Sequence, residues 1–121
     1  MYLLPQEIEV WYIIPGIRKE LSSLFVKKYK LTYEKAGNIL GISKAAVSQY
    51  LSNKRANKTK FPEIVKKEIE KSAKEIIKDN KKALIEIERI IKFIRAKKCS
   101  CEVCKKYNPE IIKYCNCDPK Y

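Results

Sequence analysis

The sequence predicts an all-α protein, and three observations support this class. Only three glycines and five prolines occur among 121 residues, which disfavours turn-rich β structure. Apolar residues recur at three- and four-residue spacing along most of the chain, as on the buried faces of helices. Several of these stretches begin at Pro, Ser or Thr, and one ends at Gly, which are helix-start and helix-stop signals. A hydrophobic content of 45% is normal for a globular chain, so we do not expect disorder.

Two helices are expected before residue 30. Pro5 and Pro15 each suit the first turn of a helix. A short helix would therefore lie between them, over QEIEVWYII, and a second would run from Pro15 to Tyr29. Core spacing in the second helix is shown by Ile17, Leu21, Leu24 and Phe25.

Residues 32–51, TYEKAGNILGISKAAVSQYL, predict two short capped helices joined by a three-residue turn. Thr32 is a good N-cap for the first helix, and Ser43 for the second. Gly41 supplies the left-handed conformation that ends the first helix. This is the helix-turn-helix layout.

The side-chain pattern of this segment divides it into inner and outer positions. Gly37, four residues before Gly41, is predicted where the two helices cross and only a small side chain fits. The predicted inner positions are Leu40, Ile42, Val47 and Tyr50. The predicted outer positions of the second helix are Lys44, Ala45, Ser48 and Gln49, which can approach base edges in a major groove. The alternative is a helical hairpin with no DNA-binding role.

The stretch LTYEKAGNILGISKAAVSQYLSNKR resembles the DNA-binding core of Cro/cI-type (XRE-like) repressors. The preceding LLPQEIEVWYIIPGIRKEL is similar to the start of archaeal regulators of that class, so the resemblance covers roughly residues 3 to 60. It implies a compact bundle whose second motif helix reads DNA. Many relatives have glutamine in place of Tyr33, where a phosphate contact is made, and alanine in place of Gly37. We expect the glycine to be sterically harmless, with a cost of up to ~1 kcal/mol in helix propensity.

The charge distribution agrees with a polyanionic partner. The formal net charge is +13, which points to nucleic acid or an acidic membrane surface, unless the lysine-rich surface is inert. Between residues 18 and 60 the acids are Glu20 and Glu34, against these basic residues: Arg18, Lys19, Lys27, Lys28, Lys30, Lys35, Lys44, Lys54, Arg55, Lys58 and Lys60. Lys54 and Arg55 are expected to contact the DNA backbone. The full predicted DNA-binding set is Thr32, Tyr33, Ser43, Lys44, Ala45, Ser48, Gln49, Asn53, Lys54 and Arg55.

A long helical region is predicted from Pro62 to about Lys98, with a break at Asp79-Asn80. Its lysines and glutamates alternate, as on a solvated face. An apolar stripe with three-four-three spacing suits a partner helix and predicts a homodimer contact through Leu84, Ile87, Ile91 and Ile94. The alternative is that the whole stripe is intramolecular core.

All five cysteines lie in CSCEVCKKYNPEIIKYCNC, residues 99–117, and the chain has no histidine. In a reducing compartment such a cluster favours metal ligation over disulfides. An iron–sulfur cluster would use Cys101, Cys104, Cys115 and Cys117, with Cys99 as the alternative ligand. The same four thiolates could instead hold a structural zinc ion, and metal-free redox thiols are a third possibility. Some archaeal regulators of the class named above carry C-terminal cysteine clusters, which favours a sensing cluster.

These observations predict three regions: a DNA-binding domain over residues 1–60, a helical dimerisation region over 61–98 and a Cys-rich metal-binding tail over 99–121. The expected function is sequence-specific transcriptional regulation of a double-stranded DNA operator by a homodimer that senses redox, iron or sulfur status. Purely structural zinc in such a regulator, and a basic RNA-binding or architectural protein, are the alternatives. We do not expect an enzyme, because histidine, a nucleotide-binding glycine loop and a paired acid site are all missing. With no apolar run of ~20 residues and no signal peptide, the expected location is the cytoplasm, away from the membrane.

Overall fold

We describe a computed structural model of the chain, which defines residues 7, 9–52 and 61–96. Every element in these ranges is helical and none is a strand, so the predicted all-α class is confirmed for them. In chain order the elements are η1 (Glu9–Ile13), α2 (Ile14–Ser23), η2 (Leu24–Lys28), α3 (Tyr33–Leu40), α4 (Lys44–Leu51), α5 (Glu63–Lys78), η3 (Asn80–Lys82) and α6 (Ala83–Ala96).

The first three elements form one continuous helical segment, so the predicted break at Pro15 is wrong. The backbone at Ile13, Ser23 and Leu24 stays in the right-handed helical region. Pro15 lies in the first turn of α2, directly after the π-helical turn η1. Proline has no N–H to donate, and its ring crowds the preceding turn of an α-helix. The wider π-helical turn η1 accommodates both effects.

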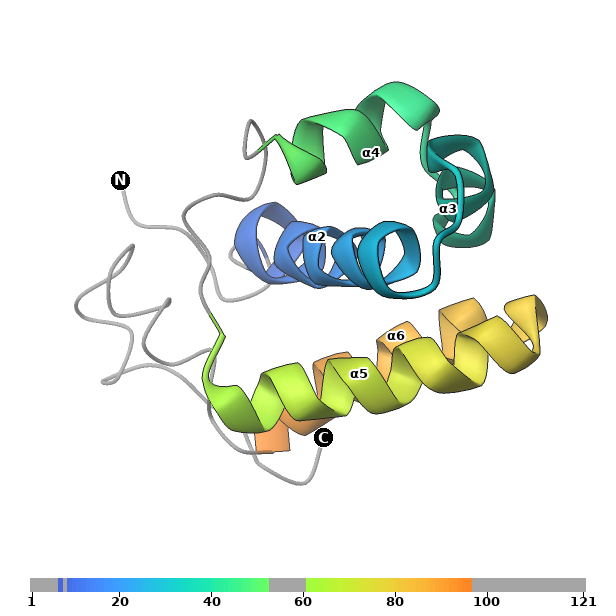
Figure 1. The fold of residues 1–121 in the computed structure, drawn as a ribbon. Helices are drawn as coiled ribbons and strands as arrows, with labels where there is room; N and C mark the ends of the chain where they lie inside the picture. The colour runs from blue at the N-terminus through green and yellow to red at the C-terminus, as the bar shows by residue number, and fades with distance from the viewer. Residues whose placement is uncertain (1–6, 8, 53–60, 97–121) are drawn as a thin grey trace.

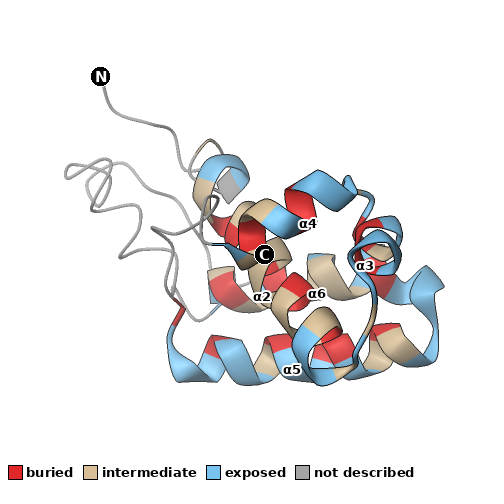
Figure 2. Ribbon diagram, turned by 45° about the horizontal axis from the view of Figure 1, so that its top comes forward, coloured by how far each residue is buried: buried red, intermediate tan, exposed pale blue. Residues whose placement is uncertain are grey.

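The helices pack around α2. Figure 1 shows α3 and α4 on one side of α2 and the α5–α6 hairpin on the other. Each of these helices carries buried residues, shown in red in Figure 2. Residues on both sides of the predicted boundary at 60 and 61 build this one core, namely Ile13, Ile17, Leu21, Phe25, Ala36, Leu40, Val47, Phe61, Val65, Ile69, Ala73, Ile76, Ala83, Ile90, Ile91 and Ile94.

The α5–α6 hairpin turns where the sequence predicts a break. Asp79 leaves the helical region with φ −149° and ψ 103°, and its Oδ1 accepts a hydrogen bond of 3.1 Å from the Lys81 N–H. The short 3₁₀ turn η3 then leads into α6. A side chain that accepts from the backbone two residues later favours a turn over a continued helix.

The predicted dimer stripe divides between the core and the surface. Ile91 and Ile94 are 9% and 1% exposed, and Ile87 is half-buried against the core. Leu84 is 73% exposed. Ile91 and Ile94 are therefore not free to contact a second chain, because α6 uses that face to pack against α5 and α3. At these two positions the structure agrees with the alternative of an intramolecular core.

Candidate nucleic-acid interface

The helices α3 and α4 and the turn between them begin and end at residues that the sequence predicts. The Thr32 Oγ1 accepts from the Lys35 N–H at 3.1 Å, and the Ser43 Oγ accepts from the Ala46 N–H at 3.0 Å. Gly41 has φ +72°, a conformation that costs glycine little. We call residues 32–51 the α3–turn–α4 unit. Its three predicted capping residues are confirmed.

Gly37 in α3 lies directly against the backbone of the turn that leads from α3 into α4. Both the Gly41 and Ile42 N–H groups donate to its carbonyl oxygen, the second at 2.9 Å. A Cβ atom at position 37 would lie 2.6 Å from the carbonyl oxygen of Ile42. The prediction that only a small side chain fits is confirmed, and glycine is sterically harmless as expected, whereas the Cβ of an alanine would meet this oxygen. The obstacle is a backbone oxygen, which cannot swing away as a side chain can.

The inner face of the unit is apolar and fixes the direction in which α4 points. Leu40, Val47 and Tyr50 are buried, and Ile42 is half-buried against the core, as predicted. Helix α4 packs on both α2 and α3. The opposite side of α4 is consequently turned away from the rest of the described chain (Figure 1).

The outer face of α4 carries three small or flexible exposed side chains. Lys44, Ala45 and Ser48 are exposed, as the sequence predicts. Gln49, by contrast, is half-buried, and its Oε1 atom is buried without a hydrogen-bond partner among the described residues. The predicted outward position of Gln49 is therefore met only in part, and this side chain would have to change rotamer to present both amide atoms to a base.

The start of α3 places two further predicted contacts at the surface. Thr32 is exposed, and Tyr33 is 37% exposed. Ser43 is likewise exposed at the start of α4. The Thr32 and Ser43 oxygens accept capping bonds, while each hydroxyl hydrogen stays available to donate to an acceptor such as a phosphate oxygen. Asn53, Lys54 and Arg55 lie outside the described residues.

The exposed lysines around the unit are not paired with acidic side chains of the described chain. Within the described ranges, no ion pair is formed by any of the exposed residues Lys27, Lys30, Lys35 and Lys44. Neighbouring Lys28 lies 5.8 Å from the centre of the Tyr29 ring. Positive charge without internal compensation is the electrostatic signature expected where phosphates bind.

Lys30 is a candidate contact that the sequence prediction missed. It has φ +58° and is the only non-glycine residue with positive φ in the described ranges. A lysine in this conformation is strained, and such strain is concentrated at functional sites. The sequence contained a signal for this conformation. The helical segment that ends with η2 must stop before Thr32, and none of the three residues in between is Gly or Asn, the residues that usually take the left-handed position.

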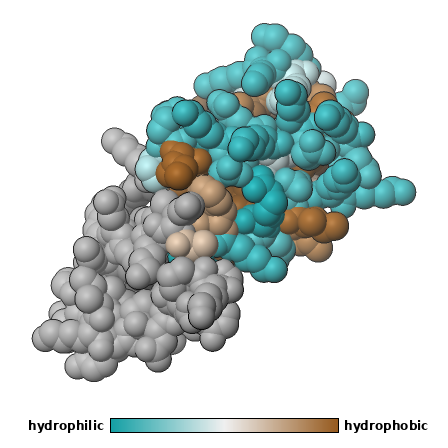
Figure 3. Space-filling view, turned by 90° about the horizontal axis from the view of Figure 1, so that it is seen from below, coloured by the Kyte–Doolittle hydropathy of each residue, from teal (hydrophilic) through white to brown (hydrophobic). Residues whose placement is uncertain are grey.

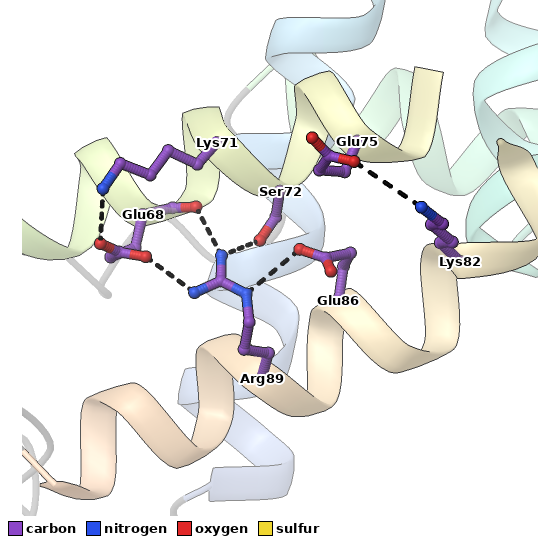
Figure 4. Close-up of polar contacts among 7 residues, drawn as sticks. All are labelled: Glu68, Lys71, Ser72, Glu75, Lys82, Glu86 and Arg89. Carbon is purple, nitrogen blue, oxygen red and sulfur yellow. Dashed lines mark hydrogen bonds and ion pairs between the residues drawn. The ribbon is translucent and has the colours of Figure 1, made fainter. Parts of the chain in front are cut away.

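The α5–α6 hairpin handles its charge differently (Figure 4). Arg89 of α6 donates from Nη1 to Glu68 Oε2 at 2.7 Å, from Nη2 to the Ser72 Oγ at 2.6 Å and from Nε to Glu86 Oε1 at 3.2 Å. The hydrogen bond from Arg89 holds the pKa of the Glu68 carboxyl below its usual range, although burial acts in the opposite direction. Burial lowers the pKa of Arg89, but the bonds to Glu68 and Glu86 outweigh it, so that this pKa is raised.

The predicted metal ligands lie outside the described residues, namely Cys99, Cys101, Cys104, Cys115 and Cys117. In the part of the chain that the structure defines, no three histidine, cysteine, aspartate or glutamate side chains come together as metal ligands. None of the helices in the same ranges is long and apolar enough to cross a membrane.

The geometry at hand is thus a short exposed helix, held by two others, beside uncompensated lysines. Comparison of the chain with models of protein families, with curated proteins and with solved structures finds no match.

Proposed function

We propose that this protein is a sequence-specific DNA-binding regulator of transcription in the cytoplasm, with a binding rather than a catalytic role. The observation that carries the proposal is the outer face of α4, where exposed Lys44, Ala45 and Ser48 lie on a helix whose other side is packed. Small and flexible polar side chains on such a helix suit the base edges of a major groove. The Cro/cI-type resemblance of residues 3 to 60 supports the same assignment.

The remaining contacts are assigned by position. Thr32, Tyr33 and Ser43, at the starts of α3 and α4, would bind phosphates on either side of the groove. Asn53, Lys54 and Arg55 follow α4 in the chain and would contact the backbone. Uncompensated lysines beside the unit would add affinity that is independent of sequence and sensitive to salt.

The test is a comparison of three nucleic acids at one salt concentration: a duplex enriched from a random pool by the wild-type protein, random duplex, and single-stranded RNA. The proposal expects the enriched duplex to bind most tightly. Lys44→Ala and Ser48→Ala should each reduce that preference, since one good base contact is worth ~1–3 kcal/mol of discrimination. Lys66→Ala is the matched control, because Lys66 is an exposed lysine on α5. Equal affinity for all three nucleic acids would favour the alternative of a basic RNA-binding or architectural protein.

We propose an iron–sulfur cluster as the cofactor of the C-terminal segment, held by Cys101, Cys104, Cys115 and Cys117, with Cys99 as a substitute. Five thiols and no imidazole make a donor set that fits all-thiolate chemistry. When bound, the cluster would give the regulator a group sensitive to oxygen, iron or sulfur. Elemental analysis of anaerobically purified protein tests this. One zinc ion per chain without sulfide would replace the cluster by a structural zinc site and leave the DNA-binding proposal intact.

The proposed regulator acts as a homodimer on two half-sites, because a single unit of this kind reads few base pairs. Of the four predicted contact residues, Leu84 remains exposed and available for such a contact.

A further inference from the structure

We propose that η3 and the first turns of α6 form a self-complementary contact surface for a second copy of this chain. Leu84 and Ile85 make its apolar centre, and Lys81 and Glu88 make its charged edges. The proposal rests on the homodimer of the proposed function and gives it an interface, but its test needs no DNA.

The apolar centre is unusually open. Leu84 and Ile85 are 73% and 65% exposed, the highest values among the exposed large apolar side chains of the described residues. The face of the molecule seen in Figure 3 carries separate apolar patches in an otherwise hydrophilic surface. Lys81, in the 3₁₀ turn η3, and Glu88, in α6, lie three residues before and after this pair. Residues three and four apart in consecutive helical turns share a face, which puts both charges on the side of Leu84 and Ile85.

The two charged edges are unpaired, although their neighbours are not. Lys82 lies 3.7 Å from Glu75, and Glu86 accepts from Arg89. Lys81 and Glu88 are both exposed, and neither forms an ion pair with another described residue. Seven residues separate them, which is about 10 Å along a helix, too far for them to pair with each other.

The order of the four residues selects an antiparallel arrangement. A two-fold axis between positions 84 and 85 would place Leu84 against Ile85 of the second copy. The same axis would place Lys81 against Glu88 of the second copy, and the reverse pair would form on the other side. Two-fold contacts are self-complementary in this way, with residue i meeting j and j meeting i. A parallel arrangement would instead bring Lys81 against Lys81 and Glu88 against Glu88.

The position of the surface is compatible with DNA binding. Helix α4 and the α5–α6 hairpin lie on opposite sides of α2, so a contact through α6 leaves the outer face of α4 uncovered (Figure 1). Four apolar side chains and two ion pairs make less than a standard interface of about 1,600 Å². We therefore expect a weak dimer in the absence of DNA, with a Kd of roughly 10–100 μM.

Charge reversal tests the pairing directly. Sedimentation equilibrium of the full chain without DNA would cover concentrations from well below to well above that Kd. Lys81→Glu and Glu88→Lys should each weaken the dimer about 10-fold or more, because each places like charges face to face. The double variant K81E/E88K restores both pairs with reversed signs and should return to within about threefold of the wild type. Lys66→Glu is the matched control for Lys81→Glu, since it makes the same change in net charge on α5 and should leave the Kd within about twofold.

Three results would overturn the proposal. The first is a wild-type protein that stays monomeric over the whole concentration range. The second is a double variant as weak as the single ones. The third is a lower midpoint of urea unfolding for the monomeric Leu84→Glu variant, because it would mean that the chain itself covers this patch. The proposal expects that midpoint to be unchanged. None of these measurements depends on duplex binding, so a failure of the DNA-binding proposal would be seen separately.

Discussion

The two sides of α2 differ in how their charged side chains are balanced. On the α5–α6 side, Lys71, Lys78 and Lys82 pair with glutamates, and Arg89 joins both helices through Glu68. On the α3–α4 side, the exposed lysines named above have no ion pair within the described residues. The hairpin thus neutralises part of its charge within the fold, whereas the exposed lysines of the α3–α4 side leave theirs available to a partner.

The polar groups of the two sides also serve different ends. In the hairpin, Arg89 supplies the hydrogen bond that the buried Ser72 Oγ needs. In the α3–turn–α4 unit, polar side chains satisfy helix ends and the backbone approaches itself closely at Gly37. We therefore expect the hairpin to be sensitive to the loss of charge pairs, and the unit to be sensitive to added volume.

The largest effect is expected for Gly37→Ala in the unit. The new Cβ would lie 2.6 Å from the Ile42 carbonyl oxygen, and the backbone must shift to relieve the overlap. Overpacking costs about 1–3 kcal/mol, and an overlap with a backbone oxygen, which cannot move aside, belongs at the upper end of about 3 kcal/mol. The ~1 kcal/mol that alanine gains in helix propensity offsets part of this cost. Urea unfolding should show a loss of stability of about 2 kcal/mol. Asn38→Ala, at the next, exposed position of α3, is the control and should not destabilise. A higher midpoint for Gly37→Ala would contradict the close approach.

The next effect is expected for Arg89→Met in the hairpin. This change removes the bonds to Glu68, Glu86 and Ser72 and leaves a buried hydroxyl without a partner. We expect a loss of about 1–2 kcal/mol, discounted because the Arg89 side chain is 41% exposed. Lys92→Met on α6 is the control, since Lys92 is exposed and outside the network. If both variants unfold at the same urea concentration, the network contributes nothing to stability.

A smaller, pH-dependent effect follows from the lowered pKa of Glu68. A carboxyl whose pKa is lower in the folded than in the unfolded state stabilises the fold above its ordinary pKa, 4.5. That contribution is lost as the pH falls below 4.5 through the lowered value. The stability difference between the wild type and Arg89→Met should thus be larger at pH 7 than at pH 3, as measured by urea unfolding at both pH values. A difference that does not change with pH would mean that Glu68 and Arg89 are not coupled.

Local signals explain which parts of this fold could be predicted from the sequence. Thr32, Gly41 and Ser43 act on backbone groups within four residues, so their roles follow from sequence spacing. Asp79 is similar, because its side chain bonds the backbone two residues later. The exposure of Lys44, Ala45 and Ser48 follows from helical periodicity once the caps are fixed.

The remaining features depend on tertiary packing, which spacing does not reveal. Ile91 and Ile94 satisfy a dimer pattern and a core pattern equally well, and the arrangement of α6 against α5 and α3 decides between them. Pro15 indicated a helix start because a preceding π turn has no sequence signature. The Arg89 network was also missed, although Ser72 was a clue, since it stands at an inner position between Ile69 and Ile76.

The smallest effect, Lys30→Gly, connects the strain of the α3–α4 side to its proposed use. Glycine adopts φ +58° without the steric cost that lysine has, but loses more entropy on folding, so we expect a net gain in stability of about 0.5 kcal/mol. If Lys30 contacts a phosphate, the same variant should bind the enriched duplex more weakly, and the slope of log affinity against log salt should fall by roughly one. Lys30→Ala separates the two effects, because it loses the charge and keeps the strain: it should bind DNA as weakly as the glycine variant without the gain in stability. The contrary outcome is a glycine variant that is more stable and binds DNA as tightly as the wild type. Lys30 would then not contact DNA, and a phosphate contact would not explain why a lysine occupies this strained position.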